Sequence, residues 1–140
     1  MQVKDIMKTN LFTLYESETI SDAQDVMILE RIRHIPVVNS SFKLVGLITH
    51  RDLIRALTRK QESCPVKLIM KKNVVVVDLS IPLRDVIKIM ITNKYGCLPV
   101  VNDSGKLVGI VTEIDLLKVL YSMIKSREDF FAKRLSKSMG

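Results

Sequence analysis

The sequence has no tryptophan, only two cysteines and two histidines, and 5% aromatic residues. Cys64 and Cys97 have no cysteine or histidine at metal-ligand spacing, so we expect reduced thiols and no metal site. His34 and His50 have no serine and acid in a recognisable catalytic setting, and no glycine-rich phosphate loop is present. These absences predict a protein that is not an enzyme.

Long hydrophobic runs are also missing. None approaches the roughly 18 to 20 apolar residues that span a bilayer. The first residues lack the apolar stretch of a signal peptide, so we expect a cytoplasmic location and no membrane span. The 140 residues, 47% of them hydrophobic, are enough for one ordinary globular core.

The chain contains an imperfect internal repeat. A shift of 63 positions, from Ile35 to Leu98, places Ile-Pro-Val-Val-Asn on Leu-Pro-Val-Val-Asn without a gap. The same shift aligns residues 3–57 with 66–120, and about two fifths of these pairs are identical. Chance does not explain so many identities, so we interpret the chain as two copies of one folding unit. Each copy is short for an independent core, and we expect the two to share a buried face.

Both copies show the order strand, helix, strand, turn, strand, helix. Thr19 and Asp22 have the spacing of a capping box, and Pro82 suits the first turn of the equivalent helix. The predicted strands are 11–14, 36–38 and 44–48, then 74–77, 99–101 and 107–111, with final helices from about Arg51 and Ile114. This is an α/β (α+β) fold, in which residues 1–62 form the first repeat with its linker, 63–124 the second, and 125–140 a basic helical tail.

The net charge is +7, and much of the excess lies in the tail. There the bases Lys125, Arg127, Lys133, Arg134 and Lys137 face only Glu128 and Asp129. A solvated basic helix explains this pattern, and a surface for nucleic acid, acidic lipid or an acidic partner is the alternative. Only Phe130 and Phe131 interleave with the bases, which is weak support for single-stranded nucleic acid.

A Gly-x-x-Thr-x-x-Asp pattern occurs at the second strand-to-helix junction of each copy, as Gly46, Thr49 and Asp52 and as Gly109, Thr112 and Asp115. The start of a helix offers free backbone N–H groups to an anionic oxygen. A threonine hydroxyl can bond ribose or phosphate, and a carboxylate can accept from two ribose hydroxyls, so the pattern predicts a nucleoside site. Thr-x-x-Asp is also a capping box, and both interpretations stay open.

The sequence resembles a tandem pair of CBS domains. The resemblance rests on the Met-Lys segment that opens each copy, the Pro-Val-Val-Asn strands, and the stretches Gly-Leu-Ile-Thr-His-Arg-Asp-Leu and Gly-Ile-Val-Thr-Glu-Ile-Asp-Leu. It implies two β-α-β-β-α units whose sheets pack with pseudo-twofold symmetry and leave two clefts between them. In this family such clefts commonly hold adenosine derivatives, including AMP, ADP, ATP, S-adenosylmethionine and dinucleotides such as NAD.

The resemblance also implies which residues bind. Asp52 and Asp115 would hold ribose hydroxyls, and Thr49 and Thr112 would contact ribose or phosphate. The residues before each Pro-Val-Val strand would line the clefts, namely Arg33, His34 and Ile35 or Gly96, Cys97 and Leu98. The early loops would frame the base, namely Thr9, Asn10 and Leu11 or Lys72, Asn73 and Val74.

The two copies differ in charge at these positions. The first carries Arg33 and His34 and then His50 and Arg51, where the second has Gly96 and Cys97 and then Glu113 and Ile114. If phosphate binding needs nearby cations, the cleft built on the first motif is the better phosphate site. The second would favour an uncharged adenosine moiety or lie empty. The alternative is that these side chains point to solvent and carry no specificity.

We therefore expect a non-catalytic regulatory module that binds an adenosine derivative and requires no cofactor. The resemblance implies a homodimer, and the module would act through its own dimer surface or through a separate protein partner. Two alternatives remain: a structural or protein-interaction module with unoccupied clefts, and a basic surface that binds nucleic acid, which the sequence favours least.

Overall fold

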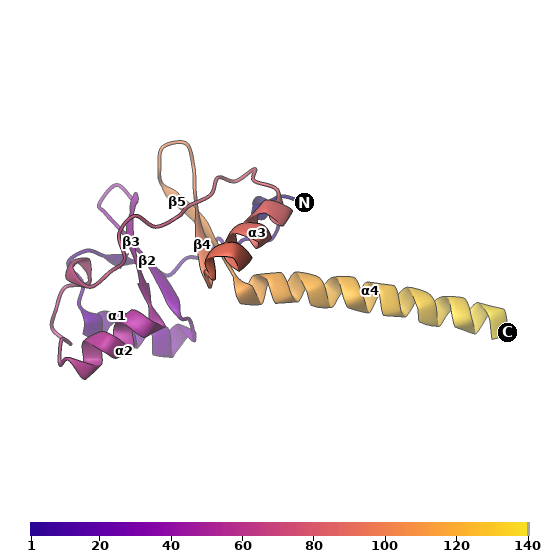
Figure 1. The fold of residues 1–140 in the computed structure, drawn as a ribbon, viewed down its shortest axis with the longest axis horizontal. Coiled ribbons are helices and arrows are strands. Elements are labelled where there is room, and N and C mark those ends of the chain that lie inside the picture. Colours follow the sequence, from indigo (N-terminus) through magenta and orange to yellow (C-terminus); the bar gives the residue numbers. More distant parts are fainter. Residues whose placement is uncertain (140) are drawn as a thin grey trace.

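The computed structural model describes residues 1–139, and the side chains of residues 1–137 (Figure 1). The first repeat contains η1 (Val3–Asp5), β1 (Leu14–Tyr15), α1 (Ile20–Glu30), β2 (His34–Val38), β3 (Leu44–Thr49) and α2 (His50–Thr58). The second contains η2 (Val66–Leu68), α3 (Leu83–Asn93), β4 (Cys97–Val101), β5 (Leu107–Thr112) and α4 (Glu113–Met139). The mixed helix and strand content and the duplication confirm the predicted fold class.

Each repeat is built on one antiparallel hairpin. Strands β2 and β3 pair with each other, and β1 adds a short parallel strand beside β2. In the second repeat β4 and β5 form a two-stranded sheet with the same register, and Pro99 faces Ile110 as Pro36 faces Leu47. The proline has no N–H to donate, yet it is tolerated because the parallel neighbour β1 begins to pair only at Val37.

The predicted strand 74–77 does not form. Only Val77 makes a bridge, with Val100, while Val75 and Val76 are 41% and 39% exposed. The predicted strand 11–14 is likewise reduced to β1. A β-branched run favours extended backbone, but a strand also needs a partner along its whole length, and here the partner covers one end.

The capping box predicted for α1 is confirmed. Asp22 N–H donates to Thr19 Oγ1 at 3.2 Å, and Thr19 N–H donates to the Asp22 carboxylate at 2.8 Å. The helix buries the apolar stripe of Ile20, Ala23 and Met27 against the sheet of its repeat.

Each hydrophobic core is completed by a segment from the other repeat. Val3, in η1, is fully buried in the second core, where its N–H donates to Ile81 O at 3.0 Å. Val66, in η2, is fully buried in the first core, and its N–H donates to Glu18 O at 2.7 Å. This exchange means that neither repeat closes its own core, so the pair folds as one unit.

A third apolar cluster lies between the repeats. Leu47, Cys97 and Ile110 are its buried members, with Leu11 and Val74 packed against them. The exchanged segments run beside it, because Lys8 N–H donates to Ile110 O at 2.8 Å and, equivalently, Lys71 N–H donates to Leu47 O at 2.9 Å. Each contact has a counterpart 63 residues along, which gives the pair its pseudo-twofold symmetry.

Helix α4 is the only described element that leaves this body. Its 27 residues begin at the β5 junction and project away from both sheets (Figure 1). The basic tail predicted from residue 125 is the continuation of this helix and not a separate one.

We predict that Gly46→Ala and Gly109→Ala each lower the free energy of unfolding. An added Cβ at Gly46 would lie 2.8 Å from Met70 Cγ and 2.9 Å from Lys71 O, and at Gly109 it would lie 3.0 Å from Met7 Cγ. Overpacking of this kind costs roughly 1–3 kcal/mol, with Gly46 the larger because a backbone oxygen cannot turn away. Urea denaturation measures the free energy of unfolding of both variants.

The double variant Gly109→Ala, Met7→Ala is the control. If the exchanged methionine causes the loss, the double variant is more stable than the sum of the two single changes predicts. Strict additivity would show that the close approach of this segment to β5 is not the reason.

Candidate ligand-binding cleft

The first Thr-x-x-Asp junction is a complete capping box, in which Asp52 N–H also donates to Thr49 Oγ1 at 3.2 Å, and the second shows the carboxylate half of the same cap. Asp52 Oδ2 accepts from Thr49 N–H at 3.0 Å and from Thr49 Oγ1 at 2.8 Å. Asp115 Oδ2 accepts from Thr112 N–H at 2.8 Å and from Thr112 Oγ1 at 3.0 Å. Both carboxylates are 6% exposed. The cap uses one oxygen of each carboxylate, so capping leaves Oδ1 available to a ligand.

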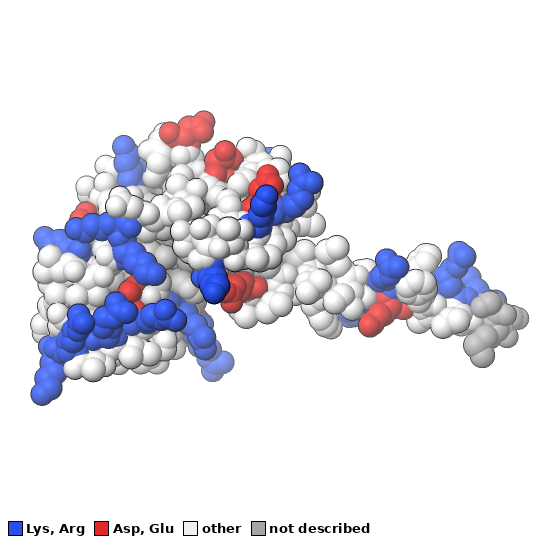
Figure 2. Space-filling model, viewed as in Figure 1, with Lys and Arg blue, Asp and Glu red and all other residues white. Residues whose placement is uncertain are grey.

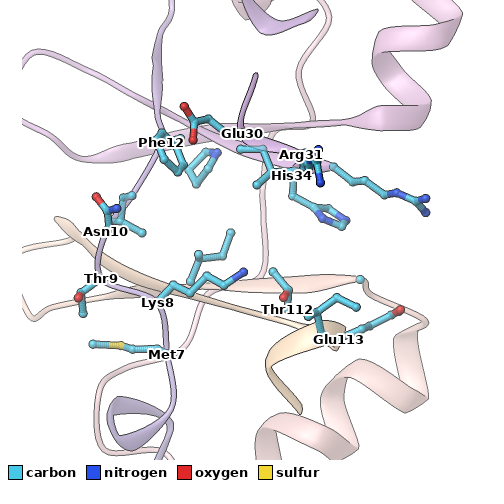
Figure 3. Close-up of a pocket in the computed structure, with 17 residues that line it drawn as sticks. Met7, Lys8, Thr9, Asn10, Phe12, Glu30, Arg31, His34, Thr112 and Glu113 are labelled. Carbon is cyan, nitrogen blue, oxygen red and sulfur yellow. The ribbon is translucent and has the colours of Figure 1, made fainter. Parts of the chain in front are cut away.

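A cleft of about 860 Å³ opens beside the second junction, and we call it the Thr112 cleft (Figure 3). One wall is the exchanged segment, residues 7–12. The opposite wall runs from the end of α1 into β2, residues 30–34 and Pro36. The floor comes from the second repeat, with Gly96, Ile110 and residues 112–114. The cleft therefore exists only where the two repeats meet.

Eight of the predicted site residues line this cleft. They come from all three walls and are Thr9, Asn10, Leu11, Arg33, His34, Gly96, Thr112 and Glu113. Residues from distant positions in the sequence thus line one cleft.

Three of the predicted residues that do not line it are buried in apolar surroundings. Ile35 and Leu98 are 0% and 1% exposed and lie in the two repeat cores, because side chains alternate along a strand and their neighbours point the other way. Cys97 belongs to the cluster between the repeats. Its burial raises the pKa of the thiol to about 12, so it stays protonated at neutral pH.

The predicted partition of charge between the clefts needs correction. Arg33 and His34 belong to the first repeat, yet they line the Thr112 cleft beside the second motif. The cause is contact across the repeat boundary: a Cβ added to Gly96 would lie 2.7 Å from His34 Nε2, and Glu113 Oε1 is 3.9 Å from the same point. Glycine at position 96 leaves the space that the imidazole occupies.

The remaining predicted residues belong to the equivalent junction of the first repeat and to the loop that follows Lys71. Lys71 pairs with Leu47 of β3, which brings the loop after it alongside the first junction. These residues are Thr49, His50, Arg51 and Asp52 with Lys72, Asn73 and Val74. Val74 also packs against the apolar cluster between the repeats.

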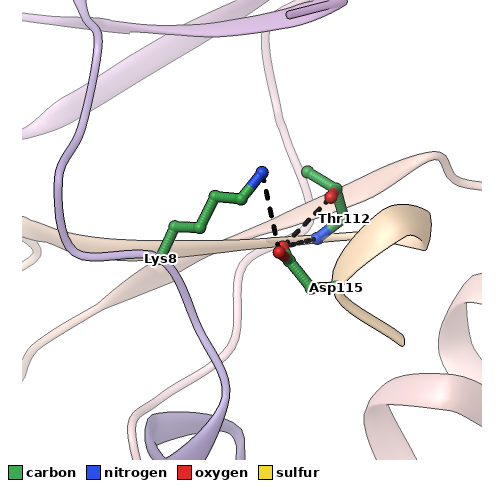
Figure 4. Close-up of polar contacts among 3 residues, drawn as sticks. All are labelled: Lys8, Thr112 and Asp115. Carbon is green, nitrogen blue, oxygen red and sulfur yellow. Dashed lines mark hydrogen bonds and ion pairs between the residues drawn. The ribbon is translucent and has the colours of Figure 1, made fainter. Parts of the chain in front are cut away.

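Lys8 stands between Asp115 and the cleft. Its Nζ lies 3.6 Å from Asp115 Oδ1, the oxygen that the cap does not use (Figure 4). Lys8 lines the cleft and its ammonium points toward Thr112, whereas Asp115 is not a lining residue in this arrangement (Figure 3). On the side of the Thr112 cleft, the ammonium of Lys8 therefore occupies the free oxygen of this carboxylate.

The cleft is lined by both cations and acids. Lys8, Arg31 and Arg33 are its bases, and Glu30 and Glu113 its acids. Burial lowers the pKa of His34 below 6.5, Glu113 opposes that shift, and Lys71 and Arg33 add to it. His34 is therefore neutral at physiological pH and can either donate or accept a hydrogen bond.

Sequence analysis missed several lining residues, among them Met7, Lys8, Phe12 and Arg31. The repeat held a signal for two of them, because Met7-Lys8 is identical to Met70-Lys71. Arg31 and Phe12 have no such mark, and only the folded arrangement shows that they face the cleft.

The CBS domain family model matches residues 3–59 and 66–122. The chain therefore belongs to the CBS domain family and contains a tandem pair of these domains.

Over 121 residues the chain is 37% identical to an uncharacterized protein of Methanocaldococcus jannaschii, MJ1225, an alignment that covers 86% of this chain and 43% of that protein. The chain spans 23% and 22% of the length of two further relatives, which carry enzyme names. It thus corresponds to a part of these longer proteins.

Two solved structures share the fold and contain ligands. The CBS domain pair of protein MJ0100, in complex with 5′-methylthioadenosine and S-adenosylmethionine, has a TM-score of 0.81 and 31% identity and covers 88% of this chain and 98% of its own. CBSX2 in complex with AMP has a TM-score of 0.78 and 27% identity and covers 87% and 97%.

No helix within residues 1–139 is both long and apolar enough to cross a membrane. The described histidine, cysteine, aspartate and glutamate side chains form no group of three that could hold a metal ion.

We predict that His34 makes stability depend on pH. Because burial lowers its pKa in the folded state, the unfolded chain binds more protons as the pH falls through 6.5, and folding becomes less favourable. Compared with His34→Gln, the unmodified chain should lose stability between pH 7.5 and pH 5, measured by thermal unfolding. Parallel stability curves for the two proteins would contradict this.

Proposed function

We propose that this chain is a non-catalytic regulatory module that binds an adenosine derivative in the Thr112 cleft. The observation that carries the proposal is the cleft itself, which both repeats form beside Asp115. One oxygen of this carboxylate caps the helix, and the other takes no part in the cap. Its volume lies in the range of small-molecule sites. Adenosine compounds bound to two other CBS pairs support this ligand class.

In this proposal the ribose binds at Asp115. Once Lys8 moves away, Oδ1 accepts from the ribose hydroxyls while Oδ2 keeps the helix cap. The Thr112 hydroxyl, which donates to Asp115, still has lone pairs to accept a further hydrogen bond. The residues that cap the helix therefore also hold the sugar.

The displaced Lys8 then favours a phosphorylated ligand. Its ammonium already points into the cleft, where Arg31 and Arg33 supply two guanidinium groups. Charge-assisted hydrogen bonds from such groups to phosphate are among the stronger ones in proteins. We therefore propose AMP, ADP or ATP as the ligand in preference to S-adenosylmethionine or NAD, with no cofactor required.

The equivalent residues of the first repeat are proposed as a second site. Asp52 keeps an Oδ1 that makes no hydrogen bond within the described residues, and Arg51 and Lys72 lie in the same set. Lys8 forms an ion pair with Asp115, whereas the equivalent Lys71 forms none with Asp52. A ligand must therefore displace a lysine from the carboxylate at the Thr112 cleft but not at the second site.

Regulation follows from the construction of the cleft. A ligand that touches Lys8, Arg33 and Thr112 contacts both repeats at once and stabilises the packing in which they stand together. The response can be no larger than the difference in affinity between the two packings. Exposed apolar side chains on the repeat helices, such as Leu29 and Ile91 at 77% and 72%, support a homodimer as the acting form.

We predict that AMP raises the melting temperature and that Asp115→Asn removes most of this effect. Binding only to the folded chain stabilises it, and the neutral amide is a poorer acceptor for ribose while it can still cap the helix. Differential scanning fluorimetry with AMP, S-adenosylmethionine and 5′-methylthioadenosine measures the shifts, and calorimetry gives the dissociation constants.

Asp52→Asn is the matched control, since it makes the same change at the equivalent cap. AMP binding at the Thr112 cleft should survive it. No shift with any adenosine compound would overturn the proposed function, and an AMP shift that Asp115→Asn leaves unchanged would overturn its assignment to this cleft.

We further predict that Lys8→Ala affects AMP and adenosine in opposite directions. AMP should bind about tenfold or more weakly because a charge-assisted contact is lost. Adenosine should bind equally well or better, because Asp115 no longer has to release an ammonium. Calorimetric titration of both ligands gives the ratio of affinities, which is insensitive to a general loss of stability.

Lys71→Ala is the control at the equivalent position of the other repeat and should leave the ratio at the Thr112 cleft unchanged. If Lys8→Ala weakens both ligands alike, Lys8 has a structural role and does not select for phosphate.

A further inference from the structure

The projecting part of α4 carries a heptad pattern. Leu117, Tyr121, Ile124, Glu128, Phe131 and Leu135 follow one another at alternating intervals of four and three residues. This spacing keeps side chains on one face of a helix and is typical of a seam between paired helices. We call these six residues the α4 seam.

The α4 seam is exposed in the chain as it stands. Leu117, Tyr121, Ile124 and Phe131 are 56%, 66%, 48% and 50% exposed. The helix is held to the body by another face, through Leu116 and Val119, which pack against the second core. The 18 steps from Leu117 to Leu135, at 1.5 Å each, give the seam a length of about 27 Å. This is long enough for a helical partner to pack along it.

The positions beside the α4 seam are basic. Between residues 118 and 134 they carry four bases and no acid: Lys118 and Lys125 on one side, Arg127 and Arg134 on the other. Figure 2 shows Lys and Arg side chains along the projecting helix, with one acidic patch and uncoloured residues of other types between them. Residues at such flanking positions set partner choice in coiled coils, so these bases favour a helix with acidic flanks.

A second copy of α4 is a poor partner. A parallel pair in register would set Glu128 against the same residue of the other helix inside the seam. Its flanks would offer only bases, leucine and alanine to the bases opposite, with no acid to meet them. Like charges facing each other disfavour association.

A membrane surface fits less well than a helix. Glu128 lies in the middle of the α4 seam, where insertion into the lipid interface would bury a carboxylate without a partner. A single polar residue in a helix–helix seam is instead a known way to set register.

We propose that the α4 seam docks an acidic amphipathic helix of another protein. The inference rests on α4 alone and not on ligand binding in the Thr112 cleft. The α4 seam would provide the surface through which the chain contacts its partner protein. In the described part of the chain, the Thr112 cleft lies at the other end of the same helix.

The test uses the full chain and two synthetic probe helices. Both have leucine at the seam positions, and they differ in carrying either glutamate or lysine at every flanking position. Isothermal titration should show binding of the glutamate peptide, at least about tenfold tighter than the lysine peptide and weakened by added salt.

Phe131 and Phe130 form a matched pair of variants. They are neighbours, 50% and 57% exposed, and each stacks with one arginine, Arg127 over Phe131 and Arg134 over Phe130. Only Phe131 lies in the seam. Phe131→Ala should weaken the glutamate peptide about tenfold or more, and Phe130→Ala about twofold or less. Circular dichroism of both variants checks that α4 remains helical.

Four results would overturn the proposal. One is no binding of the glutamate peptide, and another is equal loss in the two variants. A third is tighter α4-dependent binding to vesicles of half anionic lipid or to a single-stranded oligonucleotide. The last is self-association, seen by sedimentation, that Phe131→Ala abolishes and Phe130→Ala does not.

Discussion

The exchange of opening segments between the repeats is the constraint on which the structure depends. Val3 fills the second core and Val66 the first, so the hydrophobic effect that folds one copy also binds it to the other. The segment that follows each exchange crosses the boundary beside β5 or β3. The cleft is therefore a consequence of folding, because its wall is the same segment that completes the core.

In the proposed site, one carboxylate serves both stability and binding. Oδ2 of Asp115 caps α4, while Oδ1 faces Lys8 and the cleft behind it. Capping holds the carboxylate in place before any ligand arrives, which lowers the entropy lost on binding. The duplication provides the same device at Asp52, and the difference between the two lies in the surrounding side chains.

The two ends of α4 have different environments. Its first turn forms the floor of the Thr112 cleft through Glu113 and Ile114, and its last turns extend beyond both sheets. A helix is a stiff element, so a change in packing at the cleft moves the exposed seam as a body. This gives the proposed ligand site and the proposed docking surface a physical connection.

The sequence alone determined the duplication, the fold class, the α1 cap and the two junctions, because these depend on local spacing and on identities between copies. Eight of the predicted site residues, including Thr9 and Thr112, do line one cleft. The tertiary structure decided which copy lends its arginines to which cleft, that Ile35 faces a core, and that Lys8 covers Asp115. Those facts depend on contacts between residues that are distant in the chain. The exchange of segments and the alternation of side chains along the strands determine which of these residues come into contact.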